Sequence, residues 1–590
     1  MRTIAHVTHE AVQKIGGIGA VLEGLLTSKA YRDQNYRSIL IGPYFAGQGG
    51  PDHRLGASGE VLYSSMDGIT KHPASEALDS VRRHFHVGII YGHRTFSNPH
   101  NGARVSPEVL LIDISHIDTN KINNFKWQLW DAYGIDSSQY EDSWEYEQYV
   151  RLAQPALAIL RALDAAGPDN ECVIFSHEFM GMPTALAGQL DPSGFFRTVF
   201  YAHEVSCMRR IVEQHAGHDV TFYNVLSAAM QNGHYVDDVF GSQDRYFRHA
   251  LVKASAQCNK IFAVGDYVAK ELRFIGPDFA EADIDITYNG IPSESITLKE
   301  KGVSQSHLKD YAEVLLGDRP DYVFTHVTRC VTSKGLWRNI RVLEHLEPAF
   351  RKQGKSAVLF VLSTEVPSRD PNDIRAMERW WRWPVAHREG DPDLSGGEAL
   401  FYQGVQEFNA RSRQIKIVYV NQFGWERALC GNRMPANMQF ADIRRGSDVE
   451  FGQSIYEPFG IAQLESLTFG GICVISEVCG CAGFVDRVTG GQQVPNVIIG
   501  DYCNLGSVDM TEKELLAIDR EKRDSLERQV AGTIAKRLLE VLPRDDASTE
   551  SLLVSGYALA QQMSWEVVAK ENVLPGVEAI CRRWPRVHVA

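Results

Sequence analysis

The chain lacks several features that would point to common classes of protein. Its 590 residues carry a net charge of −14, which disfavours nonspecific binding to nucleic acid or to anionic membranes. It has no run of 18 apolar residues, so we expect no membrane span. Its ten cysteines form no CxxC pairs, and Cys479 and Cys481 are too close-set for structural zinc. We expect reduced thiols in a cytoplasmic protein, because the N-terminus also lacks the pattern of a secretory signal.

The chain does contain two series of short apolar segments separated by helical stretches. The first series runs from "TIAHVT" to "IDITYNG", and the second from "YVFTHVT" to "NVIIGD". Continuous Val/Ile-rich strands are typical of parallel sheets that are covered by helices on both faces. We therefore predict an α/β fold with two Rossmann-like, doubly wound domains facing a central cleft, with ligands at the carboxyl ends of the strands.

Polar composition suggests where the domains divide. The stretch 291–320 is polar and lacks a strand pattern, so we predict a linker there. The predicted domains are 1–305, 306–560 with an insertion at 364–414, and a C-terminal helix, 561–590, that returns to the first domain. The insertion contains "ERWWRW", which fits an oligomer contact, a polysaccharide-binding surface or a packed aromatic helix.

A glycine turn follows the first predicted strand. Gly16 and Gly17 precede a helical stripe of Ile18, Val21, Leu22, Leu25 and Leu26. Without Cβ atoms the two glycines let backbone N–H groups approach a ligand, and a helix N-terminus attracts anions. Lys14 adds positive charge. The GxGxxG spacing of dinucleotide sites is absent. An anion site and a purely structural turn both fit this pattern.

Two further motifs place charged residues after strands of the second series. In "VTRCVTSKGL", Arg329 and Lys334 can grip a pyrophosphate, or can be solvated surface cations. In "YEPFGIAQLESL", the turn at Gly460 places Glu457 before a helix, with Glu465 two turns further on. The N–H groups of residues 460–462 (Gly460, Ile461 and Ala462) would then face a phosphate, and the two carboxylates suit vicinal hydroxyls. The alternative is a helix-capping glutamate followed by an exposed one.

Other candidates follow strands or begin a helix in the first series. His203 ends "FYAHE", and His177 with Glu178 ends "CVIFSHE". Each histidine can instead be a hydrogen-bonded structural residue. Asp142 lies in "YEDSW", which also reads as a solvated helix start. Tyr456 can stack on a base, line the cleft or pack in the core.

Together these motifs resemble the glycogen and starch synthases, which are retaining glycosyltransferases of the GT-B fold. The Lys-x-Gly-Gly turn, the Arg-x₄-Lys-Gly loop and the two glutamates separated by seven residues are features of that family. The resemblance extends from Lys14 to about Leu574 and mixes bacterial-type with eukaryotic-type features. Ser143 stands where an Asn is common.

The resemblance implies a role for each candidate. It assigns the donor diphosphate to Lys14, Gly16 and Gly17, the acceptor side to Asp142, the cleft wall to His177, the donor sugar to His203 and Glu457, the leaving diphosphate to Arg329 and Lys334, and the ribose to Glu465. The expected catalytic residues are Glu457, His203, Arg329 and Lys334. Tyr456 and the amides of Gly460, Ile461 and Ala462 complete the expected substrate-binding set.

The resemblance thus implies a retaining glucosyltransferase that moves glucose from UDP- or ADP-glucose to the non-reducing end of an α-1,4-glucan. We expect no metal, cofactor, nucleic acid or membrane in this reaction. A homo-oligomer is compatible with the sequence, which leaves the oligomeric state open. The alternatives are a hexosyltransferase with a small sugar acceptor and a non-catalytic carbohydrate-binding protein.

Overall fold

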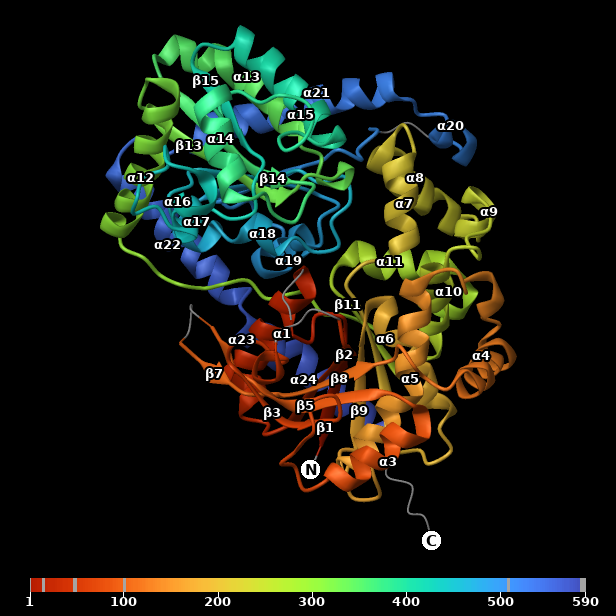
Figure 1. The fold of residues 1–590 in the computed structure, drawn as a ribbon. Helices are drawn as coiled ribbons and strands as arrows, with labels where there is room; N and C mark the ends of the chain where they lie inside the picture. The colour runs from red at the N-terminus through yellow and green to blue at the C-terminus, as the bar shows by residue number, and fades with distance from the viewer. Residues whose placement is uncertain (1, 13–15, 46–49, 99–101, 507–509, 584–590) are drawn as a thin grey trace. The chain divides into compact units, whose positions relative to one another are not determined.

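The computed structural model describes residues 2–12, 16–45, 50–98, 102–506 and 510–583 (Figure 1). The chain divides into two compact units. Unit 1 comprises Met1–Met208, Asn232–Gly290 and Trp565–Ala590, and unit 2 comprises Arg209–Gln231 and Ile291–Ser564. In the described part of the chain, every helix is too short or too polar to span a membrane.

Unit 1 is built on a ten-stranded sheet with the order β12-β11-β10-β9-β1-β2-β8-β5-β3-β4. From β12 to β8 neighbouring strands are parallel, and β1 lies between β2 and β9 with Thr3 opposite Arg37 and Cys172. The strands of this sheet are β1 (Thr3–Val7), β2 (Arg37–Pro43), β3 (Gly59–Ser64), β4 (Ile69–Thr70), β5 (Gly88–Arg94), β8 (Glu108–Asp113), β9 (Cys172–His177), β10 (Phe196–Ala202), β11 (Lys260–Ala263) and β12 (Ile284–Ile286).

One edge of this sheet differs from the all-parallel prediction. The pairs β8–β5, β5–β3 and β3–β4 are antiparallel. Parallel neighbours need a long crossover, usually a helix. Between β5 and β8 the chain instead forms a small hairpin, β6 (Phe96–Ser97) with β7 (Arg104–Val105). The chain therefore reverses direction and β8 runs back beside β5.

The helices of unit 1 follow the strands in the doubly wound pattern. The predicted stripe is confirmed, because all five of its residues are buried in α1. The helices that lie in unit 1 or begin there are α1 (Gly17–Thr27), α2 (Lys29–Arg32), α3 (Ser75–Phe85), α4 (Thr119–Tyr133), α5 (Trp144–Ala162), α6 (Glu178–Leu190), α7 (Ser206–Gln214), α9 (Val236–Phe240), α10 (Phe247–Lys253), α11 (Asp266–Ile275), α23 (Trp565–Val568) and α24 (Leu574–Arg583), and the short 3₁₀ turns are Pro51–His53, Ser137–Gln139, Ala254–Gln257 and Pro277–Phe279.

The C-terminal helices α23 and α24 are grouped with unit 1. Trp565 packs where two glycines leave room for it. A Cβ on Gly24 would lie 2.1 Å from Trp565 Nε1, and one on Gly290 would lie 2.5 Å from the Trp565 backbone N. The Glu566 carboxylate accepts hydrogen bonds from the backbone N–H groups of Lys29, at 2.7 Å, and Ala30, at 3.0 Å. Glu566 thereby caps the N-terminus of α2.

Unit 2 is built on a six-stranded parallel sheet with the order β15-β14-β13-β16-β17-β18. Helices cover both of its faces. Alternate residues of β14 pack against two different cores: Leu359 and Val361 meet α13, α15 and α21, whereas Val358 and Phe360 meet α12, α14 and α17. The strands are β13 (Tyr322–Arg329), β14 (Ala357–Thr364), β15 (Ile415–Val420), β16 (Val449–Gly452), β17 (Ile472–Ser476) and β18 (Val497–Gly500). The second strand series predicted from the sequence is this sheet.

The helices of unit 2 include the predicted insertion, whose two helices are α14 and α15. Within it Trp383 is fully buried and donates from Nε1 to Asn421 Oδ1 at 2.7 Å, while Trp380 is 70% exposed. The helices are α8 (His218–Gln231), α12 (Leu298–Leu316), α13 (Trp337–Gln353), α14 (Pro371–Trp381), α15 (Gly396–Arg411), α16 (Arg427–Cys430), α17 (Phe440–Arg445), α18 (Ile461–Leu464), α19 (Gly480–Thr489), α20 (Glu512–Leu516), α21 (Arg520–Val541) and α22 (Asp546–Gln562), with 3₁₀ turns at Thr332–Lys334 and Leu467–Phe469.

Most of the polar stretch 291–320, for which the sequence predicted a linker, forms helix α12. The boundary that the sequence suggested, 305/306, falls inside α12, whereas the compact units divide at Gly290 and Ile291. Lys301 of α12 is buried and donates to the carbonyl oxygens of Ser447 at 2.9 Å and Phe469 at 3.0 Å. These bonds attach α12 firmly to unit 2.

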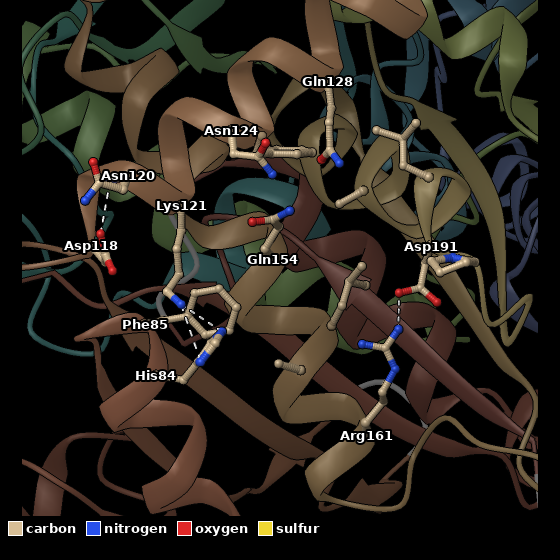
Figure 2. A pocket seen from close by; sticks show the side chains of 16 residues that line it. His84, Phe85, Asp118, Asn120, Lys121, Asn124, Gln128, Gln154, Arg161 and Asp191 are labelled. Carbon is tan, nitrogen blue, oxygen red and sulfur yellow. Dashed lines mark hydrogen bonds and ion pairs between the residues drawn. The ribbon is translucent and has the colours of Figure 1, made fainter.

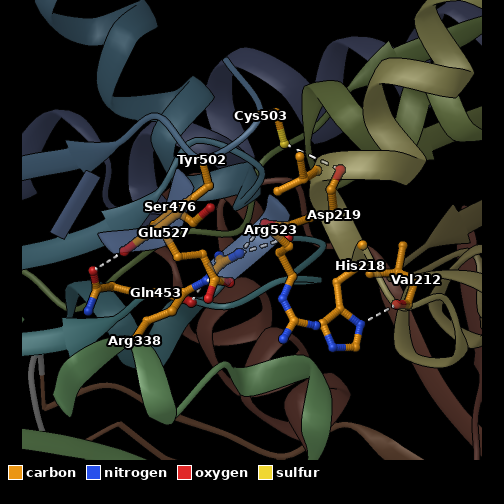
Figure 3. Close-up of polar contacts among 12 residues, drawn as sticks. Val212, His218, Asp219, Arg338, Gln453, Ser476, Tyr502, Cys503, Arg523 and Glu527 are labelled. Atoms are coloured by element: carbon orange, nitrogen blue, oxygen red, sulfur yellow. Dashed lines mark hydrogen bonds and ion pairs between the residues drawn. The ribbon is translucent and has the colours of Figure 1, made fainter. Parts of the chain in front are cut away.

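A buried ion cluster ties the segment Arg209–Gln231 into unit 2 (Figure 3). Arg338 of α13 is fully buried and donates from Nη2 to both carboxylate oxygens of Asp219, at 2.7 and 2.8 Å. Its Nε donates to Glu527 of α21 at 2.9 Å, and its guanidinium lies 3.7 Å from the ring centre of Tyr502. One cation thus joins α8, α13 and α21.

Candidate functional site

In unit 2 the candidate residues gather at the carboxyl ends of the adjacent strands β13 and β16. Lys334, in the loop after β13, forms an ion pair with Glu457, in the loop after β16. The backbone N–H groups of Ile455 and Tyr456 both donate to the carbonyl oxygen of Ser333, at 2.8 and 3.3 Å. The two loops are therefore held together by main-chain bonds as well as by opposite charge.

The turn after Glu457 depends on glycine. Gly460 has a φ of 97°, and a Cβ there would lie 2.7 Å from Gln463 Oε1. The left-handed backbone and the lack of space both exclude a larger residue. Gln463 donates from Nε2 to Glu457 Oε2 at 3.3 Å and to Ser454 Oγ at 2.9 Å. The Glu457 carboxylate is thus oriented by an ion pair and an amide.

The second glutamate lies closer to the turn than expected. Helix α18 has a single turn, Ile461–Leu464, and Glu465 is its C-cap rather than a residue two turns into a helix. Glu465 Oε2 forms an ion pair with Arg444 Nη2 at 2.7 Å, and Arg444 Nη1 is 3.0 Å from Glu450 Oε1. Burial raises the pKa of Glu450, an effect that the neighbouring Arg444 counteracts. Arg444 therefore links Glu465 to a carboxylate inside β16.

Arg329 and Tyr456 have opposite environments. Arg329, the last residue of β13, is exposed, and its guanidinium makes no hydrogen bond or ion pair with any described residue. Tyr456 is only 1% exposed, which fits the packed-core alternative, and the Arg209 guanidinium lies 5.6 Å from its ring centre. A cation available to a ligand thus stands five residues before Lys334 in the sequence.

In unit 1 the two candidate histidines are bonded to each other. His177 lies at the end of β9, and His203 lies just after β10. His177 Nδ1 is hydrogen-bonded to His203 Nε2 at 2.9 Å. His177 Nε2 contacts Nδ1 of His6, in β1, at 3.0 Å. His6 and His177 are fully buried, and His203 is partly exposed. Three adjacent strands therefore contribute one row of imidazoles.

The residue after His177 is held in a rare backbone conformation. Glu178 has a φ of 60° although it is not a glycine, and it is 3% exposed. Its Oε1 accepts from the backbone N–H of Glu204 at 2.5 Å, next to His203. Such left-handed residues cost free energy and are concentrated at functional sites. Glu178 thus couples the end of β9 to the end of β10.

The glycine turn contains a carboxylate that the sequence did not reveal. Glu10 Oε2 accepts from the backbone N–H groups of Gly16 at 2.8 Å and Gly19 at 3.0 Å, and Glu10 is 2% exposed. The Gly16 amide predicted to face a diphosphate is therefore bonded to Glu10. A Cβ on Gly17 would meet nothing within 4 Å. Lys14 lies outside the described residues.

Asp142 is exposed and directly precedes α5. Ser143 is the N-cap of that helix, because its Oγ accepts from the Tyr146 N–H at 3.4 Å. Nearby, Glu145 pairs with Arg248 Nη2 at 2.7 Å. The helix-start reading of "YEDSW" is thus correct for Ser143, while the Asp142 carboxylate has no hydrogen-bond partner among the described residues.

Unit 1 also has features separate from the strand ends. A pocket of about 580 Å³ is lined by amides of α4 and α5, including Asn120, Asn124, Gln128 and Gln154, and none of the predicted residues lines it (Figure 2). Elsewhere, ligand atoms of Asp237, Asp244 and His249 lie within 4.8 Å of one another, close enough to share a cation. Lys253 Nζ already lies 4.0 Å from Asp237 Oδ2.

The residues missed by sequence reasoning are His6, Glu10 and Arg444. His6 stands in a recognised strand, but its contact depends on β1 lying beside β9. Glu10 precedes the glycine turn by six residues, and a carboxylate upstream of a helix start is the signal that could have found it. Arg444 lies in α17, with no motif of its own.

Comparison with known proteins agrees with this architecture. The two Rossmann-like α/β units have the fold of the GT-B glycosyltransferases, as predicted. An E. coli structure named as trehalose-6-phosphate bound with UDP-2-fluoro glucose aligns with a TM-score of 0.50 and 11% identity, covering 98% of this chain and 99% of that one. A UDP-forming trehalose-phosphate synthase from Burkholderia xenovorans aligns at 13% identity and a TM-score of 0.48, over 98% and 100% of the chains.

Among proteins with curated functions, the chain is similar to a glycogen [starch] synthase of Dictyostelium discoideum. The two are 20% identical over 98% of this chain. The chain spans 66% of the length of that relative. A comparison with models of protein families found no match to the chain.

Proposed function

We propose that the chain is a retaining glucosyltransferase that moves glucose from a nucleotide-diphosphate glucose to the non-reducing end of an α-1,4-glucan. The observation that carries this proposal is that Arg329 ends strand β13 of unit 2, while Lys334 and Glu457 form an ion pair on the loops after β13 and the adjacent strand β16. The similarity to a glycogen synthase supports the glucan acceptor, and the GT-B fold supports a nucleotide-sugar donor.

The proposed chemistry of unit 2 is electrostatic. When the anomeric C–O bond breaks, negative charge accumulates on the leaving diphosphate, and fixed cations stabilise it. Arg329 is unpaired among the described residues and can meet a phosphate bidentately. Lys334 exchanges its bond to Glu457 for one to phosphate, which frees the Glu457 carboxylate to bind sugar hydroxyls. Glu465 is assigned the ribose hydroxyls, beside its partner Arg444.

The proposed role of unit 1 is to contact the donor sugar through His203 and the diphosphate through the glycine turn. Gly17 supports the second assignment, because neither a positive φ nor a neighbouring atom requires glycine there. Space next to a helix N-terminus suits a phosphate. Asp142 is assigned to the acceptor side. With the charge supplied by arginine, lysine and backbone amides, we expect the reaction to need no metal ion.

The proposal is tested by nucleotide release from ADP-, UDP- and GDP-glucose, with and without glycogen, in the presence of EDTA. We expect glycogen-dependent release, with UDP-glucose as the first donor to try, and an α-anomeric product by NMR. Release that depends on a small sugar or sugar phosphate instead would identify the other acceptor class. A β-anomeric product, or no release with any donor, would contradict the proposal.

A further inference from the structure

The three histidines of unit 1 form a chain that begins at a buried tyrosine. Tyr31 OH lies 3.0 Å from Ser38 Oγ and 3.4 Å from His6 Nε2. From there the chain continues through His6 Nδ1 to His177 Nε2 at 3.0 Å, and through His177 Nδ1 to His203 Nε2 at 2.9 Å. Every ring nitrogen of His6 and His177 is used. The chain ends at Nδ1 of His203, which has no partner among the described residues.

The surrounding rings hold this chain in place. Neighbouring imidazoles have nearly parallel planes, 25° apart for His6 and His177 and 12° apart for His177 and His203. Tyr201 stacks on both His177 and His203, with ring centres 5.4 and 4.5 Å away. Phe175 packs edge-on against His6 at 5.2 Å. This packing restricts rotation of the imidazole rings toward other hydrogen-bond partners.

All three imidazoles are neutral near pH 7. Burial lowers the pKa of His6 to about 3, and it does the same for His203. Burial, together with the two flanking histidines, lowers the pKa of His177 well below its ordinary value. A neutral imidazole has one N–H donor and one acceptor nitrogen. Each ring in the chain must therefore donate on one side and accept on the other.

Only two proton orders satisfy both ring-to-ring bonds. In one order every ring carries its proton on Nδ1, and His203 ends the chain with a free N–H. In the other order every ring carries its proton on Nε2, His6 donates to the Tyr31 oxygen, and Tyr31 donates to Ser38. The Nε2–H form is the intrinsically more stable tautomer of neutral histidine. The second order therefore gives each of the three rings its more stable tautomer.

We propose that Tyr31 and His6 are positioning residues that set the tautomer of His203 through His177, so that His203 presents an unprotonated Nδ1 to a donor-sugar hydroxyl. The role of the sugar rests on the proposed function, whereas the proton order does not. The row of hydrogen bonds makes the tautomer of the partly exposed His203 depend on the phenol of Tyr31, which is separated from it by two imidazoles. It also keeps charge out of the buried cluster, where charge would be costly.

The test is imidazole ¹⁵N NMR of the intact protein, labelled in histidine, without substrate. Protonated and unprotonated ring nitrogens resonate far apart, and signals are assigned by replacing each of the three histidines by Gln in turn. We expect all three rings to be protonated on Nε2. In Tyr31→Phe the His6 N–H loses its acceptor, so we expect all three protons to move to Nδ1 together. His6→Phe removes the acceptor of His177 and is expected to change His203 in the same way.

The matched control is Tyr36→Phe, because the Tyr36 ring lies 5.8 Å from that of Tyr31 but outside the chain. It should leave all three tautomers unchanged. If His203 keeps its proton on Nε2 in both Tyr31→Phe and His6→Phe, or if the parent protein shows a mixed order, the proposal is wrong.

Activity separates this proposal from the proposed function. Loss of one acceptor to the sugar should lower kcat/KM for UDP-glucose about five- to tenfold in Tyr31→Phe and leave it unchanged in Tyr36→Phe. Concerted tautomer changes in a protein without transfer activity would overturn the proposed function alone. Normal glucosyl transfer in a protein whose three histidine tautomers do not change together would overturn the proposed tautomer coupling alone.

Discussion

Lys334 and Glu457 lie 123 residues apart in the sequence and form an ion pair at the ends of two neighbouring strands of unit 2. Their side chains are only 11% and 14% exposed. A pair so shielded from water keeps much of its electrostatic strength. It holds a carboxylate and a cation ready at the place where the proposed donor would bind.

The first prediction concerns Glu457. In Glu457→Gln the side chain keeps its shape and its contact with Gln463 but loses its charge. We expect glucosyl transfer to fall at least 10²-fold, because the sugar loses its carboxylate partner and Lys334 its counter-charge. Circular dichroism and thermal unfolding should show an intact fold. The exposed Glu407→Gln is the control, and equal turnover in the two variants would remove Glu457 from the site.

The second prediction concerns Arg329. Its guanidinium has no protein partner among the described residues, so Arg329→Ala should leave stability within about 0.5 kcal/mol of the parent. Loss of a cation from the leaving diphosphate should lower kcat by about 10²–10³-fold. The control is Arg411→Ala, which removes an exposed cation from the same unit. Steady-state kinetics with saturating donor measure kcat for both variants. An unchanged kcat in Arg329→Ala would contradict the assignment.

The third prediction concerns the glycine turn. Glu10→Ala removes the acceptor of two backbone N–H groups at the start of α1. Because hydrogen bonds to a charged group are strong, we expect the free energy of unfolding to fall by about 2 kcal/mol. Glu281→Ala, in an exposed loop of the same unit, should have little effect. Denaturant titration measures both variants, and equal midpoints would show that Glu10 does not hold the turn.

The fourth prediction concerns acid stability. Burial, with help from Lys334 and Arg444, lowers the pKa of His326 to about 3, against about 6.5 when unfolded. Between these values the unfolded chain binds the extra proton, so stability is lost as the pH falls below 6.5. His326→Gln should reduce the slope of unfolding free energy against pH by about 1.4 kcal/mol per unit between pH 4 and 6. An unchanged slope would exclude this role.

The fifth prediction concerns the buried cation of unit 2. Arg338→Met leaves Asp219 and Glu527 buried without their shared partner, and we expect a loss of about 3–5 kcal/mol. Arg520→Met, on the exposed side of α21, is the control. The double variant Arg338→Met/Asp219→Asn should recover part of the loss, since it removes one of the stranded charges. If its effect is simply the sum of the single variants, the two side chains are not coupled.

The strands were predictable because burial on both faces leaves continuous apolar runs. The antiparallel strand β3, "GEVLYS", was missed since it is partly polar and only partly buried. Helix α12 was taken for a linker because its stripe is weak. Its capping box, in which Thr297 and Glu300 bond each other's backbone N–H groups, was legible in the sequence.

The site was less predictable than the fold, because its contacts join residues that are far apart in the sequence. Motifs identified Lys334 and Glu457 as candidates but not as partners, because the contact depends on β13 lying beside β16. His6 looked like any strand residue until β1 and β9 were paired. Arg338 and Asp219, 119 residues apart, carry no motif at all.

The segment Arg209–Gln231 has a practical consequence for dissecting this protein. The chain passes from one unit to the other four times, so neither unit is a continuous stretch of sequence. A fragment 291–564 would keep Arg338 and Glu527 but discard Asp219, and would expose the surface on which α8 packs. Splitting this protein into halves at a single cut should therefore yield insoluble pieces, whereas supplying residues 209–231 as a separate peptide should restore folding of the larger fragment.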